Sequence, residues 1–169
     1  MKLQSIAQNP QYSNFTGKHV KPKEIARMSI EEVLNPHELS LSAKTLVKKS
    51  HQLMEETWTR IKKKEIKMET PSYTKEFNSK KVTLSPLYNG YDRNIVLNIK
   101  EEKNNYRILV DKTANNFVYE KSVNTDFGSA TIYSYNSKIS PKSETTTKLV
   151  SELLEEYLPK FTKHLSDRL

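Results

Sequence analysis

Apolar residues recur at three- and four-residue spacing along one stretch of the chain, which predicts a long amphipathic helix. Asn35 fits its N-cap, Pro36 suits the first helical position, and Glu38 lies three residues after the cap. The apolar stripe consists of Leu39, Leu46, Val47, Leu53, Met54, Trp58 and Ile61. The helix is expected to reach about Lys64, and a shorter piece just before it extends the helical segment to residues 29–68.

The period of the pattern changes after this segment. Residues 69–81 contain Pro71 and few apolar positions, so they are predicted to be a linker. Beyond them apolar positions alternate, as in strands, and the first such stretch begins at Val82 and ends at Pro86. Further alternating stretches cover 95–99, 106–110, 117–119 and 130–135. Short polar turns separate them, which predicts an antiparallel meander, because parallel strands need long crossovers.

The last strand and a final helix complete the expected fold. Strict alternation predicts that Tyr133 shares a face with Thr131 and Tyr135. A helix from about Ser143 carries a wide apolar face, and Pro159 is expected to kink or end it. The sequence therefore predicts an α+β fold with a long amphipathic helix, an antiparallel four- to five-stranded meander and a C-terminal helix packed on the sheet. The sheet and this helix would occupy residues 82–169.

The N-terminal residues show no sustained period. Residues 1–28 carry isolated apolar side chains among polar ones, interrupted by prolines and a glycine, so they are predicted to be a flexible or docking arm. Tyr12 and Phe15 are candidate protein contacts on this arm. Trp58 on the long helix is a third, because a tryptophan is costly to leave in water.

Charge adds a second candidate surface. The 169 residues carry 28 basic and 20 acidic side chains, for a net charge of +8. The surplus is concentrated in residues 18–27 and 60–67, which would form one anion-binding patch for nucleic acid, an acidic protein or a membrane surface if they are adjacent in space. Its candidate residues are Lys18, Lys21, Lys23, Arg27, Arg60, Lys62, Lys63, Lys64 and Lys67. The alternative is a solvated arm and a helix end whose cations offset the helix dipole.

The composition offers little material for catalysis. The absence of cysteine excludes disulfides, thiolate metal sites and cysteine nucleophiles. The three glycines are scattered and form no phosphate-binding loop, and no histidine has metal-ligand spacing. We therefore expect no enzyme, no catalytic residue, no metal site and no cofactor. Since no apolar run has membrane-spanning length and no signal peptide is recognisable, a cytoplasmic protein without a membrane partner is expected.

One short resemblance accompanies these features. Residues 107–113 with Phe117 and Val118 resemble the hairpin of FlaG-type flagellar accessory proteins, although Glu-Lys-Ser-Val at 120–123 replaces the Ile-Pro-Pro-Glu that follows it in that family. The sequence predicts a non-enzymatic adaptor of phage, mobile-element or flagellar accessory type. It would contact another protein through the arm and the long helix, or a second copy through the long helix. The alternative is a nucleic-acid-binding protein that uses the lysine-rich patch.

Overall fold

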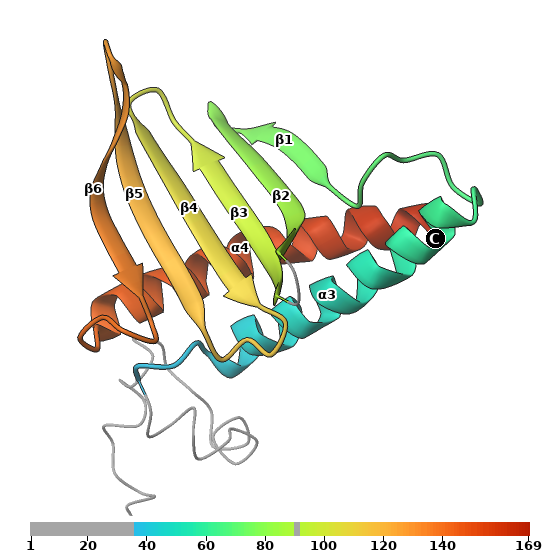
Figure 1. The fold of residues 1–169 in the computed structure, drawn as a ribbon, viewed down its shortest axis with the longest axis horizontal. Coiled ribbons are helices and arrows are strands. Elements are labelled where there is room, and N and C mark those ends of the chain that lie inside the picture. Colours follow the sequence, from blue (N-terminus) through green and yellow to red (C-terminus); the bar gives the residue numbers. More distant parts are fainter. Residues whose placement is uncertain (1–35, 90–91) are drawn as a thin grey trace, which may run out of the picture.

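Two helices and six strands lie in the part of the chain that the computed structural model describes, residues 36–89 and 92–169 (Figure 1). The elements in chain order are α3 (Leu41–Lys62), β1 (Tyr73–Phe77), β2 (Lys80–Asn89), β3 (Asp92–Lys100), β4 (Asn104–Asp111), β5 (Phe117–Thr125), β6 (Gly128–Asn136) and α4 (Glu144–Arg168). The strands form one sheet in the order β1-β2-β3-β4-β5-β6, each antiparallel to the next. The predicted α+β meander is confirmed, with six strands rather than four or five.

The long helix begins later than predicted. Ser40 is the N-cap of α3, and its hydroxyl accepts a hydrogen bond from the Ala43 amide at 3.1 Å. Glu38 lies before the helix and pairs with Lys44 at 2.7 Å. Pro36 belongs to the preceding turn, while Asn35 lies outside the described residues. A serine caps as well as an asparagine, and this one also anchors the helix, because the Ser40 amide donates to the Ser151 hydroxyl of α4 at 3.0 Å.

The helix ends at Lys62 in a Schellman turn. The Lys64 amide donates to the Ile61 carbonyl and the Glu65 amide to the Arg60 carbonyl, both at 2.9 Å. Lys64 takes a φ of 58° to close this turn. A left-handed conformation is unfavourable for a residue with a side chain, so glycine is the usual choice at this position.

The predicted linker at 69–81 is wrong in its central part, because β1 lies there. Asn78 and Ser79 take φ values of 49° and 67° and form a two-residue turn that returns the chain as β2. Most of β1 is solvent-exposed and its middle is charged by Lys75 and Glu76. Tyr73 and Phe77 pack against the core, but the exposed Lys75 between them breaks the apolar alternation from which strands are recognised.

The prediction that a strand ends at Pro86 is also wrong, because β2 continues through it to Asn89. The turn makes Phe77 and Lys80 a hydrogen-bonded pair, so alternate residues of β2 direct their backbone groups toward β1. Pro86 is one of these, but β1 reaches only as far as Leu84. The backbone nitrogen of Pro86 therefore faces no neighbouring strand. Its lack of an N–H costs the sheet no hydrogen bond, so proline is tolerated there.

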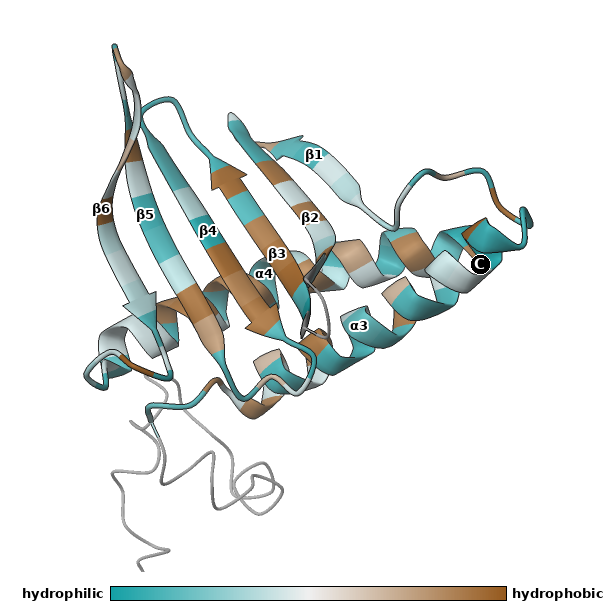
Figure 2. Cartoon of the chain, viewed as in Figure 1, coloured by the Kyte–Doolittle hydropathy of each residue, from teal (hydrophilic) through white to brown (hydrophobic). Residues whose placement is uncertain are grey.

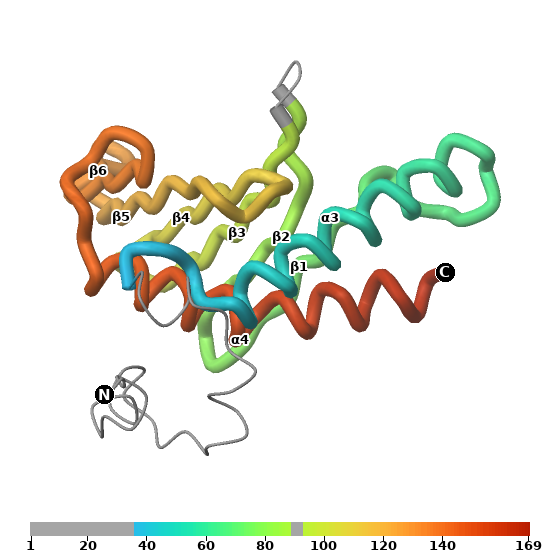
Figure 3. Tube along the Cα trace, turned by 90° about the horizontal axis from the view of Figure 1, so that it is seen from below, coloured from blue at the N-terminus to red at the C-terminus, as the bar shows by residue number. Residues whose placement is uncertain are grey.

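The two helices run parallel along one face of the sheet, as Figure 3 shows from below. The N-terminal end of α3, at Ser40, lies beside Ser151 of α4. Near its C-terminal end, the Arg60 guanidinium donates a hydrogen bond to the Leu169 backbone oxygen at 2.6 Å. Small buried side chains recur every seventh position of α3, at Ala43, Ser50 and Thr57. The two hydroxyls donate to carbonyls of their own helix, which satisfies them without a partner. Small residues at this spacing let the helices approach closely.

The hydrophobic core fills the space between the sheet and the helices. The largest fully buried side chains come from both helices and from the central strands, and they include Phe161, Met54, Leu84, Ile95, Leu97, Ile108, Leu154, Leu158 and Leu165. Hydrophobic residues are concentrated in β3 and adjoining parts of β4 and β5 (Figure 2). Pro159 lies inside α4 without ending it, and the helix passes behind the whole sheet. The opposite face of the sheet carries no helix within the described residues.

Candidate interaction surfaces

The described half of the predicted basic patch lies where α3 ends. Lys62, Lys63, Lys64 and Lys67 are exposed there. Arg60 is already engaged, since it pairs with Glu65 at 3.1 Å and donates to the Leu169 backbone oxygen. The last turn of α4, with exposed Arg168, ends beside it. The other half of the patch, Lys18, Lys21, Lys23 and Arg27, lies outside the described residues, and so do Tyr12 and Phe15.

Trp58, the remaining candidate protein contact, is half-buried rather than protruding. It borders a cavity of about 290 Å³ with Tyr88 and Arg93, at the junction of α3 with the β2–β3 hairpin. Arg93 forms an ion pair with Glu55 and its guanidinium lies 5.4 Å from the centre of the Tyr88 ring. The buried Trp58 indole nitrogen makes no hydrogen bond of normal geometry. Burial, helped by the Glu55 charge, raises the pKa of Tyr88. The side chains that line this cavity join α3 to the sheet.

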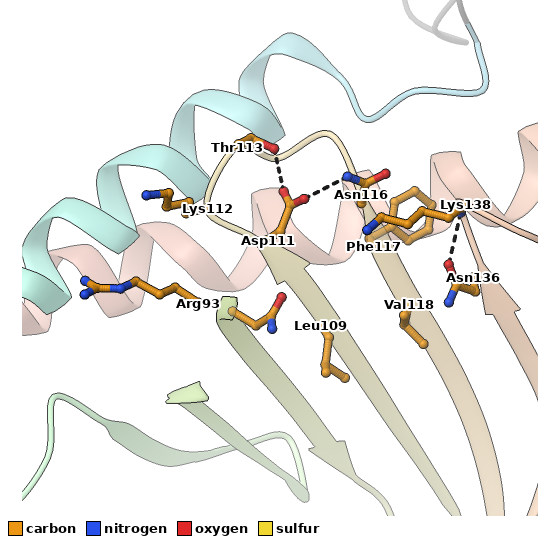
Figure 4. Close-up of a pocket in the computed structure, with 11 residues that line it drawn as sticks. Arg93, Leu109, Asp111, Lys112, Thr113, Asn116, Phe117, Val118, Asn136 and Lys138 are labelled. Atoms are coloured by element: carbon orange, nitrogen blue, oxygen red, sulfur yellow. Dashed lines mark hydrogen bonds between the residues drawn. The ribbon is translucent and has the colours of Figure 1, made fainter. Parts of the chain in front are cut away.

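A larger depression of about 340 Å³ lies where β3 begins, β4 ends and β5 begins. It is on the open face of the sheet, the face that is not covered by the helices (Figure 4). Its apolar floor includes Leu109 and Val118. Asp111 at its rim accepts hydrogen bonds from the Thr113 hydroxyl at 2.8 Å and the Asn116 amide at 2.9 Å. Burial alone would raise the pKa of Asp111, but these bonds and the backbone amides beyond them outweigh burial and lower it. The carboxylate is thus committed to holding the β4–β5 loop.

The rest of this open face is polar. Val96, Leu109 and Val118 form an apolar row across three strands. Two residues away along β4 and β5, Arg107 forms an ion pair with Glu120 at 3.8 Å. A shallow cavity of about 300 Å³ lies over this ion pair, and at its border the Asn105 side chain donates to that of Asn124 at 2.7 Å. The polar groups largely satisfy one another. They contain no nucleophile beside a base and no arrangement typical of a catalytic site.

The histidines provide no such site either. Within the described residues, no three His, Asp or Glu side chains are placed to hold a metal ion. His51 is 5% exposed, and its Nε2 has no hydrogen-bond partner. Burial lowers the pKa of His51, against a backbone hydrogen bond to Val110 and the charges of Asp111 and Glu55, which raise it. A neutral histidine packed under the sheet is a core residue. Glu55, one turn further along α3, pairs with Arg93.

The edge strand β6 differs from the other edge of the sheet. Its nine residues, Gly128–Asn136, include no charged side chain, whereas the five-residue β1 has Lys75 and Glu76. Exposed apolar side chains lie on β6 and in the turns at its two ends. They are Phe127, Ile132, Tyr133 and Ile139, with exposed fractions of 101%, 56%, 42% and 82%. Sheet edges are usually protected by short length, by charge or by a bulge; β6 is neither short nor charged, and the bulge described next is its one such feature.

A bulge interrupts β6 at Ile132. Lys121 of β5 lies opposite Tyr133, but the next residue, Ser122, lies opposite Thr131, which leaves Ile132 as the extra residue. The predicted alternation is therefore wrong here: Tyr133 and Tyr135 face the helices, while Thr131 faces the open side. Tyr133 packs toward α4, where its hydroxyl lies 2.8 Å from that of Thr146. Because a register shift depends on the neighbouring strand, nothing in the sequence of β6 alone indicates it.

The pairing also determines which backbone groups of β6 are unpaired. The Ser137 amide donates to the Phe117 carbonyl at 3.0 Å, so Tyr135 and Tyr133 direct their backbone groups toward β5. By the same alternation Thr131 and Ser134 direct theirs outward, away from the sheet. Asn136 also points outward, but the following turn satisfies it, since its amide donates to the Ser140 hydroxyl at 2.9 Å and its carbonyl accepts from Ser140 at 2.8 Å. In the described structure β6 has a single neighbour, β5.

Comparison with known proteins identifies no relative. No family model, curated protein or solved structure matches the chain. Among the described residues, no helix is long and apolar enough to cross a membrane.

Proposed function

We propose that this chain is a non-enzymatic binding protein, an adaptor that acts through protein–protein contact at the edge of β6. The observation that supports this most is the outward backbone of Thr131 and Ser134 on a strand of nine residues without charge. Unpaired backbone groups on an edge strand are a template for adding a strand from another chain. Exposed Ile132 and Tyr133 beside them would supply apolar contact area.

The helix that the sequence favours as the contact element is less suited to this role. The apolar stripe of α3 is occupied by its own fold, since Val47 and Met54 are fully buried. Self-association through α3 would require this stripe to leave α4 and the sheet. We therefore assign the contact to β6. The proposed setting is the cytoplasm, with an accessory role in a phage, mobile-element or flagellar system as the working context.

Site-specific photo-crosslinking tests the proposal. A photoreactive residue replaces Ile132, and in a matched control it replaces Thr74, an exposed residue of the other edge strand. We expect a protein cross-link from position 132 that disappears when Ser134→Pro is added, because proline removes an outward N–H. Equal products from both positions, no product, or a product unaffected by Ser134→Pro would contradict the proposal.

A second candidate function is nucleic-acid binding at the end of α3. The observation that favours it is the group of exposed lysines Lys62, Lys63 and Lys64 beside the C-terminal end of α4. Binding to a single-stranded oligonucleotide, measured by fluorescence anisotropy, would weaken linearly in log affinity with log salt. Lys62→Ala/Lys63→Ala should make this slope less steep by roughly 0.7 for each phosphate that the protein no longer neutralises. Absence of binding at low salt would exclude this candidate.

A further inference from the structure

We propose that the strand that pairs with β6 comes from a second copy of this chain, antiparallel, with Thr131 of each copy opposite Ser134 of the other. This inference rests on the proposed function and names its partner. The two-fold axis would pass between Ile132 and Tyr133, and the two six-stranded sheets would become one continuous sheet.

The directions of the backbone groups support this register. In an antiparallel pair, two residues that both point their backbone groups at each other exchange two hydrogen bonds. Thr131 and Ser134 are the outward-pointing residues nearest the middle of β6. Across the two-fold axis, Thr131 of each copy would lie opposite Ser134 of the other, which gives two such pairs. The outward groups of Asn136 are already satisfied by the Ser140 turn, so the pairing would be centred on the bulge.

The bulge favours a second copy over an unrelated extended peptide. Outward-pointing residues of a regular strand lie two apart, but Thr131 and Ser134 are three apart because Ile132 is the extra residue. A regular strand would therefore be in register with one half of β6 and out of register with the other. A second β6 has its own extra residue at the same place, so hydrogen bonding can continue on both sides of the bulge.

The side chains around the axis are also self-complementary. Ile132 of one copy would lie opposite Tyr133 of the other, on the side of the sheet that faces the helices, and these are the exposed apolar residues of the strand. No charges of β6 itself would be brought together. At each end, Asp126 next to the fully exposed Phe127 would approach Lys138 next to exposed Ile139 of the other copy. Opposite charges and apolar side chains would thus meet at both ends.

The mass of the 169-residue chain in solution tests the pairing. Sedimentation is measured from about 1 to about 500 µM, because a small edge-to-edge interface is expected to be weak. We expect the mass to rise from 19.7 kDa toward twice that value. Ser134→Pro should remain at 19.7 kDa, while the matched control Ser134→Thr, which keeps the N–H, should associate like the wild type. A constant monomer mass, or association of Ser134→Pro equal to that of the wild type, would overturn the inference.

The absence of cysteine allows a direct test of the register. Thr131→Cys and Ser134→Cys proteins are oxidised separately and as a mixture. Opposite residues of a hydrogen-bonded pair lie roughly 5.5 Å apart at Cα, within the range for a disulfide, whereas each position lies about 10 Å along the strand from its own symmetry mate. We expect the mixture to cross-link several-fold faster than either protein alone. Equal rates would refute the register.

These outcomes separate the inference from the proposed function. If the purified chain is monomeric but position 132 cross-links to a different protein in a manner sensitive to Ser134→Pro, then β6 binds a heterologous partner and only the inference fails. If the purified chain is monomeric and position 132 gives no cross-link, both fail. A cross-link to a second copy together with a doubled mass supports both.

Discussion

Proline substitution at two positions of β6 tests the assignment of its inward and outward backbone groups. Ala130 and Ser134 are both exposed, so neither replacement removes much packing. They differ in backbone direction: Ala130 lies opposite Val123 and points toward β5, whereas Ser134 points away from it. Ala130→Pro therefore loses a hydrogen bond of the sheet, and Ser134→Pro does not.

The expected magnitudes follow from this difference. Because Ala130 is exposed and water can reach the carbonyl left behind, the lost hydrogen bond is worth roughly 0.5–1.5 kcal/mol, and Ala130→Pro should lower the free energy of unfolding by about that amount. For Ser134→Pro, the reduced freedom of the unfolded chain gives a gain of up to about 1 kcal/mol, which offsets the restriction of φ. We expect the two variants to differ by roughly 1 kcal/mol, or about 2–4 °C in Tm for a chain of this size.

Urea unfolding at low micromolar protein, with linear extrapolation to water, measures these free energies. Ala130→Ser and Ser134→Ala provide controls that keep the N–H at each position. If Ser134→Pro is destabilised as much as Ala130→Pro, then Ser134 donates to β5. Its backbone would not be available to another chain, and both proposals would lose their basis.

Three further predictions concern the rest of the fold. Leu154→Ala should lower the free energy of unfolding by roughly 2–5 kcal/mol in urea titrations, because Leu154 is fully buried in the core; a loss below about 1 kcal/mol would contradict that packing. Lys64→Gly should raise Tm by the equivalent of roughly 1 kcal/mol, because glycine takes the left-handed conformation without strain. Lys63→Gly should not raise Tm, since Lys63 has an ordinary φ of −80°. A rise in both variants or in neither would contradict the Schellman turn. Burial holds the pKa of His51 below its ordinary value of 6.5, so the unfolded chain binds more protons and stability should fall as the pH drops below about 7. In His51→Gln this fall should be smaller, with the remainder due in part to His164, whose pKa burial also lowers; an unchanged slope would contradict a neutral His51 in the core.

Much of the fold could be predicted from the periodicity of apolar residues. The stripe with Val47 and Met54, the strands around Leu97 and Ile108 and the final helix from Ser143 all combine a buried face with a clear period. The wrong predictions fall where burial is one-sided or absent. The exposed residues of β1 have the pattern of a linker, and the continuation of β2 through Pro86 depends on a gap in its neighbour that the local sequence does not reveal.

The candidate surface was harder to predict because its properties are relations between strands. The lack of charge in 128–136 is visible in the sequence, but it acquires meaning only when β6 lies at an edge. The register shift that turns Tyr133 toward α4 depends on how β5 pairs with it. The predicted contact Trp58, in contrast, rests on residue type alone, and this side chain packs beside Tyr88 within the fold.

Hydrogen exchange of individual amides measures the availability of β6 most directly. The amides of Ala130, Tyr133 and Tyr135 point toward β5 and should be protected at every protein concentration. The amides of Thr131 and Ser134 should exchange rapidly in dilute protein and be slowed several-fold at high concentration, as the second copy pairs with them. If Thr131 and Ser134 are already protected in dilute monomer, or exchange equally fast at every concentration, the account of β6 as a self-pairing edge is wrong.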